Sequence, residues 1–259
     1  MPRYFMQLAY RGAPFHGWQT QPNATSVQQT VEQALGLLLR HPTPIVGAGR
    51  TDAGVNASMM VAHFDTGSVI TDAPRLVGKL NAILGRDIAV RTIDPVPSDA
   101  HARFDATSRT YHYYAHTRRS PFLPPLSWQA PPTLDFEAMN RAARQLLVTE
   151  DFTSFAKLHS DAVTNICHVS RAEWVKCDPS DSSRRVFIIT ADRFLRNMVR
   201  AVVGTLVDVG RHKLSEEDFA RVIASRDRCA AGTSMPPEPL FLHRVTYPPY
   251  WTPAEPVGD

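Results

Sequence analysis

The chain has 259 residues, of which 43% are apolar and 20% charged, and its 28 basic and 25 acidic side chains leave a formal net charge of +3. This length and balance predict a globular protein of one or two domains and exclude an intrinsically disordered chain. No run reaches the roughly 18 apolar residues of a membrane span, and the first residues lack the apolar core of a secretory signal, so we expect a cytoplasmic protein.

The first part of the chain alternates strands and helices in the order β-α-β-β-α-β. Apolar patterning predicts strands at residues 3–11, 45–46, 58–65 and 88–96. Ser26 and Gln29 have the spacing of a helix N-cap and predict a helix that ends near residue 40. Leucines at helical spacing predict a second helix around residues 76–84. This order is typical of the split β-α-β, or ferredoxin-like, fold.

The rest of the chain is also predicted to be α+β. Apolar patterning predicts strands at residues 103–117, 166–175, 185–191 and 240–247. Asp135 and Ser215 are candidate N-caps for two helices, and a strongly apolar helix is expected at residues 195–209.

Two proline-containing stretches predict the domain organisation. Pro95 and Pro97 indicate a linker, which gives an N-terminal α+β domain at residues 1–98 and a second α+β domain at residues 99–250. Residues 251–259 form a proline-rich tail that we expect to be disordered.

Composition says little about cofactors and partners. The three cysteines have no C-x-x-C spacing and the histidines no metal-ligand spacing, so we expect neither a disulfide framework nor a metal. Only four of the 28 basic residues are lysine, which leaves 24 arginines. Arginine suits phosphate and base contacts in RNA, although composition bias in the genome explains the same count.

A glycine-bracketed loop at residues 47–55 contains Arg50 and Asp52. Glycine permits close approach of a ligand, so the loop could present Asp52 beside a substrate. The spacing is neither a dinucleotide fingerprint nor a phosphate-binding P-loop. Asp52 fits either a nucleophile or an ordinary turn residue, and the local sequence alone favours the turn.

In the apolar helix at 195–209, Arg200 lies on the same flank as Val203 and Val207. A charge in such a place is destabilising unless it is paired, so we expect Arg200 to reach a carboxylate. Asp52 and the nearer Asp192 are the candidates. The alternative is that the Arg200 side chain extends to water.

The predicted strand from residue 103 is aromatic and basic. Alternation places Tyr111 and Tyr113 on one face and His112 and Tyr114 on the other. Tyrosines on a sheet can stack on RNA bases, but they more often pack across strands.

Taken in order, five segments resemble the TruA-type family of tRNA pseudouridine synthases over nearly the whole chain. They are residues 10–21, 47–55, 104–111, 194–200 and 230–248. The pair G-R-T-D-A-G-V at 49–55 and F-L-R-N-M-V-R at 194–200 is highly specific. Asn56 departs from the histidine usual in the family at this place.

The resemblance implies an isomerase that converts uridine to pseudouridine at the end of the anticodon loop and in the adjoining stem of tRNA. It implies the pseudouridine synthase fold, with two ferredoxin-like halves in a large, mostly antiparallel mixed sheet, helices on one face and a central cleft. It further implies a homodimer that binds tRNA and needs neither a metal nor an organic cofactor.

The resemblance also assigns residue roles. Asp52 is the nucleophile, which attacks C6 of the base or C1′ of the ribose, or deprotonates the sugar. Arg200 is the ion-pair partner of Asp52, and Tyr111 stacks on the flipped base or transfers a proton. Arg50 fills the gap left by that base or binds a phosphate. Two alternative classes are a non-catalytic RNA-binding or tRNA-folding module and a metal-dependent hydrolase or phosphotransferase with an aspartyl nucleophile.

Overall fold

The computed structural model describes residues 1–121, 125–157 and 163–256. The chain forms two compact units, which we describe separately. Unit 1 comprises Met1–Ser108 and Leu242–Asp259, and unit 2 comprises Arg109–Phe241. The division therefore falls ten residues after the predicted boundary at 98/99, and the end of the chain belongs to the first unit.

Unit 1 contains the predicted β-α-β-β-α-β order. Its elements are β1 (Arg3–Tyr10), α1 (Val27–Leu39), β2 (Val46–Gly47), β3 (Asn56–Asp65), α2 (Ala73–Leu84) and β4 (Ile88–Val96). The strands are ordered β4-β1-β3, with β2 beside β3, and each of these three pairings is antiparallel. The last strand, β9 (Leu240–Thr246), follows β3 in this order.

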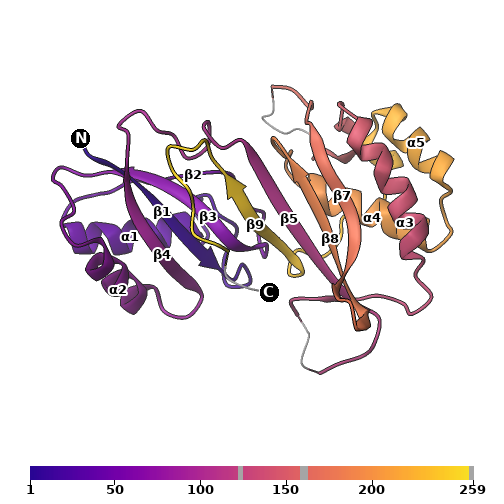
Figure 1. Cartoon of the computed structure of the whole chain (residues 1–259), viewed down its shortest axis with the longest axis horizontal. Helices are drawn as coiled ribbons and strands as arrows, with labels where there is room; N and C mark the ends of the chain where they lie inside the picture. The colour runs from indigo at the N-terminus through magenta and orange to yellow at the C-terminus, as the bar shows by residue number, and fades with distance from the viewer. Residues whose placement is uncertain (122–124, 158–162, 257–259) are drawn as a thin grey trace. The chain divides into compact units, whose positions relative to one another are not determined.

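The helices of unit 1 form where capping and periodicity predict them. The Ser26 hydroxyl accepts a hydrogen bond from the Gln29 backbone N–H at 3.1 Å, which satisfies one of the free donors at the start of α1. Asp72 caps α2 in the same way. Each helix buries one apolar stripe, and α2 packs against both α1 and β4 (Figure 1).

The end of the chain packs on β1, where the sequence predicted disorder from residue 251. Trp251 is buried, and its ring meets Phe5 edge-on with centroids 5.0 Å apart. Gln7 on β1 donates a hydrogen bond to the Ala254 carbonyl at 2.9 Å. These contacts bury apolar surface that the tail composition alone does not reveal, while residues 257–259 lie outside the described residues.

Unit 2 is built from β5 (Ser108–His116), β6 (Trp128–Gln129), α3 (Phe136–Ala143), β7 (Val169–Asp178), β8 (Asp181–Ala191), α4 (Met198–Gly210) and α5 (Glu216–Ser225). The strands are ordered β5-β8-β7 with antiparallel pairing, and β6 pairs with β5 in parallel, so the sheet is mixed. In Figure 1, the three helices gather beside β7 and β8, and α3 contacts both α4 and α5.

Two elements of the second half begin later than predicted. β5 starts at Ser108 and not at residue 103, because residues 101–105 form a hydrogen-bonded turn in which Asp105 accepts from the His101 N–H at 2.8 Å. α4 starts at Met198 and not at residue 195, because Asn197 has a left-handed backbone with φ of 65°. No helix in the described ranges is both long and apolar enough to cross a membrane.

Candidate active site

The loop that carries Asp52 connects β2 to β3 in unit 1. Asp52 is half-buried, and its carbonyl accepts a hydrogen bond from the Val55 N–H at 3.1 Å. Gly54 inside this turn has φ of 79°, a conformation that glycine adopts without strain. The sequence therefore forms a tight turn directly after Asp52, as the glycine spacing predicted.

A second loop, residues 12–18, holds Thr51 on the N-terminal side of Asp52. The Trp18 N–H donates to the Thr51 carbonyl at 3.2 Å, and the hydroxyls of Tyr10 and Thr51 are 2.8 Å apart. Gly17 has φ of 87°, and a Cβ there would lie 2.5 Å from the Thr51 oxygen. Only glycine therefore allows the two loops to approach this closely.

The same loop holds the chain on the C-terminal side of Asp52. The Gly12 N–H donates to the Asn56 side-chain oxygen at 2.8 Å, and a Cβ on Gly12 would lie 2.3 Å from the Val55 carbonyl oxygen. Asn56 is almost fully buried, so this hydrogen bond satisfies a polar group that water does not reach. Asn56 thus fixes the loop at the start of β3.

These contacts define a loop clamp, formed by Gly12, Gly17 and Trp18 on one side and by Thr51 and Asn56 on the other. The clamp engages both sides of Asp52, so the position of the Asp52 backbone is fixed by its neighbours. Such preorganisation is what a reacting carboxylate requires, because misplacement by about 1 Å can lower a rate by about 100-fold.

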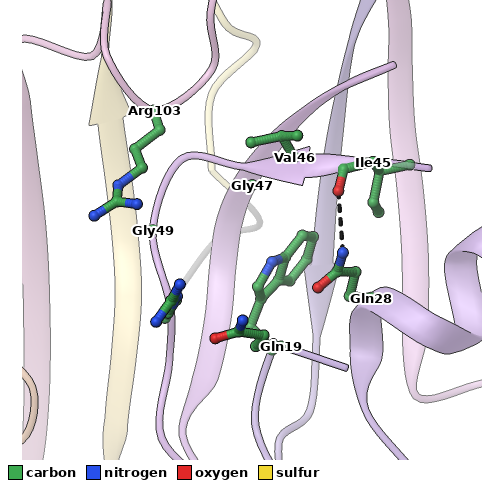
Figure 2. A pocket seen from close by; sticks show the side chains of 9 residues that line it. Gln19, Gln28, Ile45, Val46, Gly47, Gly49 and Arg103 are labelled. Carbon is green, nitrogen blue, oxygen red and sulfur yellow. Dashed lines mark hydrogen bonds between the residues drawn. The ribbon is translucent and has the colours of Figure 1, made fainter. Parts of the chain in front are cut away.

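A surface pocket of about 160 Å³ lies beside this clamp. It is lined by Trp18, Gln19, Gln28, Ile45, Val46, Gly47, Gly49, Arg50 and Arg103. At one end, the Gln28 side-chain amide donates to the Ile45 carbonyl at 3.1 Å, and Figure 2 shows this bond as a dashed line. Arg103 extends toward the loop at Gly49 in the same view. The pocket therefore places two guanidinium groups and an open glycine next to the Asp52 loop.

Tyr111 lies on β5 in unit 2. It is half-buried, and its ring meets Phe194 edge-on with centroids 5.0 Å apart. The predicted alternation is confirmed on the opposite face, where His112 Nδ1 lies 3.3 Å from the Tyr114 hydroxyl. Tyr113 is fully buried, and this burial raises the pKa of its hydroxyl while the nearby Arg200 opposes the shift.

Arg200 lies in the first turn of α4 and is half-buried. Its Nε donates to the Met235 carbonyl at 2.6 Å, and the Met235 N–H donates to the Arg200 carbonyl at 3.1 Å. The segment around Met235 therefore fixes both the backbone and the side chain of Arg200. Asp192, the nearer candidate partner, accepts hydrogen bonds from the His168 and Arg193 N–H groups through Oδ1.

The predicted site residues fall into two pairs. Arg50 and Asp52 share one loop of unit 1, whereas Tyr111 and Arg200 belong to unit 2. Among the described residues, no group of three or more His, Cys, Asp or Glu side chains could hold a metal ion.

Sequence reasoning missed the residues that position the loop, above all Gly17 and Asn56. Two glycines and a tryptophan within residues 12–18 were an available signal for a close backbone approach. Asn56 was another signal, because it is a polar residue at the start of a mostly apolar strand.

Comparison with known proteins gives a consistent result. The sequence profile of a family described as tRNA pseudouridine synthase matches residues 7–105 and 142–248. The chain is 55% identical over 255 residues to tRNA pseudouridine synthase A of Parabacteroides distasonis, covering 98% of this chain and 100% of that protein. It is 34% identical over 248 residues to the protein of the same name from Exiguobacterium sibiricum, covering 96% and 98% of the two chains.

Proposed function

Because the chain belongs to the tRNA pseudouridine synthase family, we propose that it isomerises uridine to pseudouridine in the anticodon stem-loop of tRNA. The observation that supports this site assignment best is the loop clamp, which fixes the backbone on both sides of Asp52. A turn residue with no other role would not require such extensive anchoring by a separate loop.

The reaction rearranges the bonds of one nucleoside and leaves its atom count unchanged. The bond between N1 of uracil and C1′ of ribose breaks, the base turns, and a bond forms between C5 and C1′. The hydrogen of C5 leaves as a proton, and N1 gains one. The detached base must stay in place, so the site must hold the ring and exclude water. The target uridine must also leave its stack, which takes a few kcal/mol.

Asp52 is the nucleophile in this proposal. Its carboxylate forms a transient bond to C6 of the base or to C1′, or it removes a proton from the sugar, and each route uses the same ionised group. Arg50, two residues earlier and exposed, fills the gap left by the flipped base or binds a phosphate.

Tyr111 is assigned to stacking on the flipped base, because its ring is half-buried and braced edge-on by Phe194. Tyr111→Phe keeps the ring and removes the hydroxyl. If the hydroxyl transfers a proton, turnover of this variant should fall by about 100-fold with little change in KM. An unchanged rate would restrict Tyr111 to stacking.

Arg200 is assigned as the ion-pair partner that orients the Asp52 carboxylate. Arg200→Met keeps much of the apolar stem of the side chain, so tRNA affinity should stay within a few-fold while kcat falls by roughly 100-fold or more. Arg196→Met, an exposed change on the same segment, is the matched control. A near-normal kcat for Arg200→Met would refute the ion-pair role.

The family also supports proposals on architecture. We propose that each unit is a ferredoxin-like half, a proposal supported by the strand orders β4-β1-β3-β2 in unit 1 and β5-β8-β7 in unit 2. We propose that the two halves enclose a central cleft, and that the chain works in the cytoplasm as a homodimer with one tRNA contacting both subunits.

The test is release of tritium from tRNA that contains C5-labelled uridine. The wild-type chain should release tritium from the anticodon stem-loop in stoichiometric amounts, and the rate should be the same in the presence of a chelator. Binding of tRNA without tritium release would favour a non-catalytic RNA-binding module. A rate that a chelator abolishes would favour metal-dependent chemistry.

A further inference from the structure

The pocket beside the Asp52 loop contains Arg103 and Gly49, to which none of the assigned roles refers. Of its nine lining residues, two are arginines and none is acidic. Two guanidinium groups around an open pocket are suited to bind an anion. The planar set of N–H donors on each guanidinium group fits the oxygens of a phosphate. In a protein that binds tRNA, the anion that is always present is the phosphodiester backbone.

Gly49 has no structural reason to be glycine. Its φ is not in the left-handed region, and a Cβ built on it would meet no heavy atom within 4 Å. Gly47, two residues earlier, differs, because a Cβ there would lie 2.6 Å from the Trp18 indole. Glycine loses more conformational entropy on folding than other residues, so a glycine at position 49 is unfavourable for folding itself. The missing side chain leaves space that the protein does not fill. That space faces the pocket.

Arg103 is presented to the pocket by a rigid turn. The His101 Nδ1 accepts hydrogen bonds from the N–H groups of Arg103 and Phe104 at 3.1 and 3.2 Å. The intervening Ala102 donates to the buried His63 Nδ1 at 3.1 Å. The backbone of this turn is thus fixed at three successive residues, while the Arg103 side chain reaches toward the Gly49 loop (Figure 2).

We propose that this pocket is a subsite for a backbone phosphate of the tRNA strand adjacent to the target uridine. Arg103 binds the phosphate oxygens, and Gly49 lets the strand approach the loop backbone. The subsite rests on the proposed function, because it takes its ligand from the same tRNA, but it adds a contact that anchors the strand outside the reacting nucleoside.

The first test measures tRNA affinity against salt concentration, with fully converted tRNA so that no turnover occurs. The logarithm of the tRNA association constant falls linearly with the logarithm of the salt concentration. Each lost phosphate contact makes this slope less steep by about 0.7–0.9. Arg103→Gln should therefore weaken binding roughly ten-fold at low salt and lower the slope by about one. Arg91→Gln, an equal charge change at an exposed position on β4, should change neither. An unchanged slope for Arg103→Gln overturns the proposal.

The second test adds a side chain at position 49, in the space that glycine leaves open. Gly49→Ala should fold with an unchanged melting temperature, because its Cβ would meet no heavy atom within 4 Å. Gly49→Val adds two further methyl carbons at the same position, and its melting temperature is measured beside that of Gly49→Ala. Both should weaken tRNA binding, by about three-fold for Gly49→Ala and by about ten-fold or more for Gly49→Val. Gly78→Ala, at an exposed position in α2 that is equally open, is the control and should leave binding unchanged.

The outcomes separate this subsite from the proposed function. If the wild-type chain isomerises uridine while the Arg103 and Gly49 variants bind tRNA with unchanged affinity and slope, the subsite is wrong and the function stands. If the wild-type chain releases no tritium from tRNA, the proposed function is wrong. A reduced slope in Arg103→Gln would then mark only a tRNA-binding surface.

Discussion

Asp52→Asn should lower tritium release from labelled tRNA by roughly three orders of magnitude or more, because an amide cannot act as the nucleophile or base. The change is nearly isosteric, and the clamp holds the loop through Thr51 and Asn56 on either side of Asp52. We therefore expect the fold to be retained and tRNA affinity to stay within a few-fold of wild type.

The matched control is Asp87→Asn, which makes the same chemical change in unit 1 at a half-buried aspartate that pairs with Arg11 at 3.1 Å. It should lower turnover by less than about two-fold, since an ion pair this open to water contributes little. Turnover near the wild-type rate in Asp52→Asn would return Asp52 to the role of an ordinary turn residue and would leave the site without its nucleophile.

Gly17→Ala should strongly lower turnover, although Gly17 is not a reacting group. The left-handed backbone at Gly17 is strained for any other residue by about 1–2 kcal/mol, and the new methyl carbon would lie 2.5 Å from the Thr51 carbonyl oxygen. The two loops must separate to relieve this contact, which weakens the Trp18–Thr51 hydrogen bond and shifts Asp52. We expect kcat to fall by about 100-fold, and stability by about 2–4 kcal/mol.

Gly67→Ala tests whether glycine loss alone explains such an effect. Gly67 lies in an exposed loop of the same unit, where an added Cβ meets no atom within 4 Å. Its kcat should be that of the wild type. A wild-type kcat in Gly17→Ala would mean that the loop clamp does not position Asp52, even if the protein were less stable.

Local sequence patterns predicted most of the elements that carry the site. The strand at 88–96 has the bounds of β4, and the N-cap at Ser26 opens α1 as its spacing indicated. The glycine spacing around Asp52 correctly indicated a tight turn, because a glycine requirement at positive φ is set by the turn itself. These features depend on residues within a few positions of one another.

Contacts between distant residues could not be predicted in the same way. The end of the chain returns to unit 1, where β9 lies beside β3 and Trp251 covers Phe5, and no local pattern encodes that pairing. The hydrogen bond from Gly12 to Asn56 likewise joins residues 44 positions apart. The family resemblance singled out Asp52 as the candidate nucleophile, and the structure adds the contacts that fix its backbone on both sides.

The most direct test of the account is a map of pseudouridines in tRNA from cells that lack this gene and from the same cells carrying either the wild-type gene or the Asp52→Asn variant. We predict that pseudouridines of the anticodon stem-loop disappear in the deletion strain, return with the wild-type gene and stay absent with Asp52→Asn. Their persistence in the deletion strain, or their return with the variant, would contradict the assignment of the reaction to this chain and its Asp52 carboxylate.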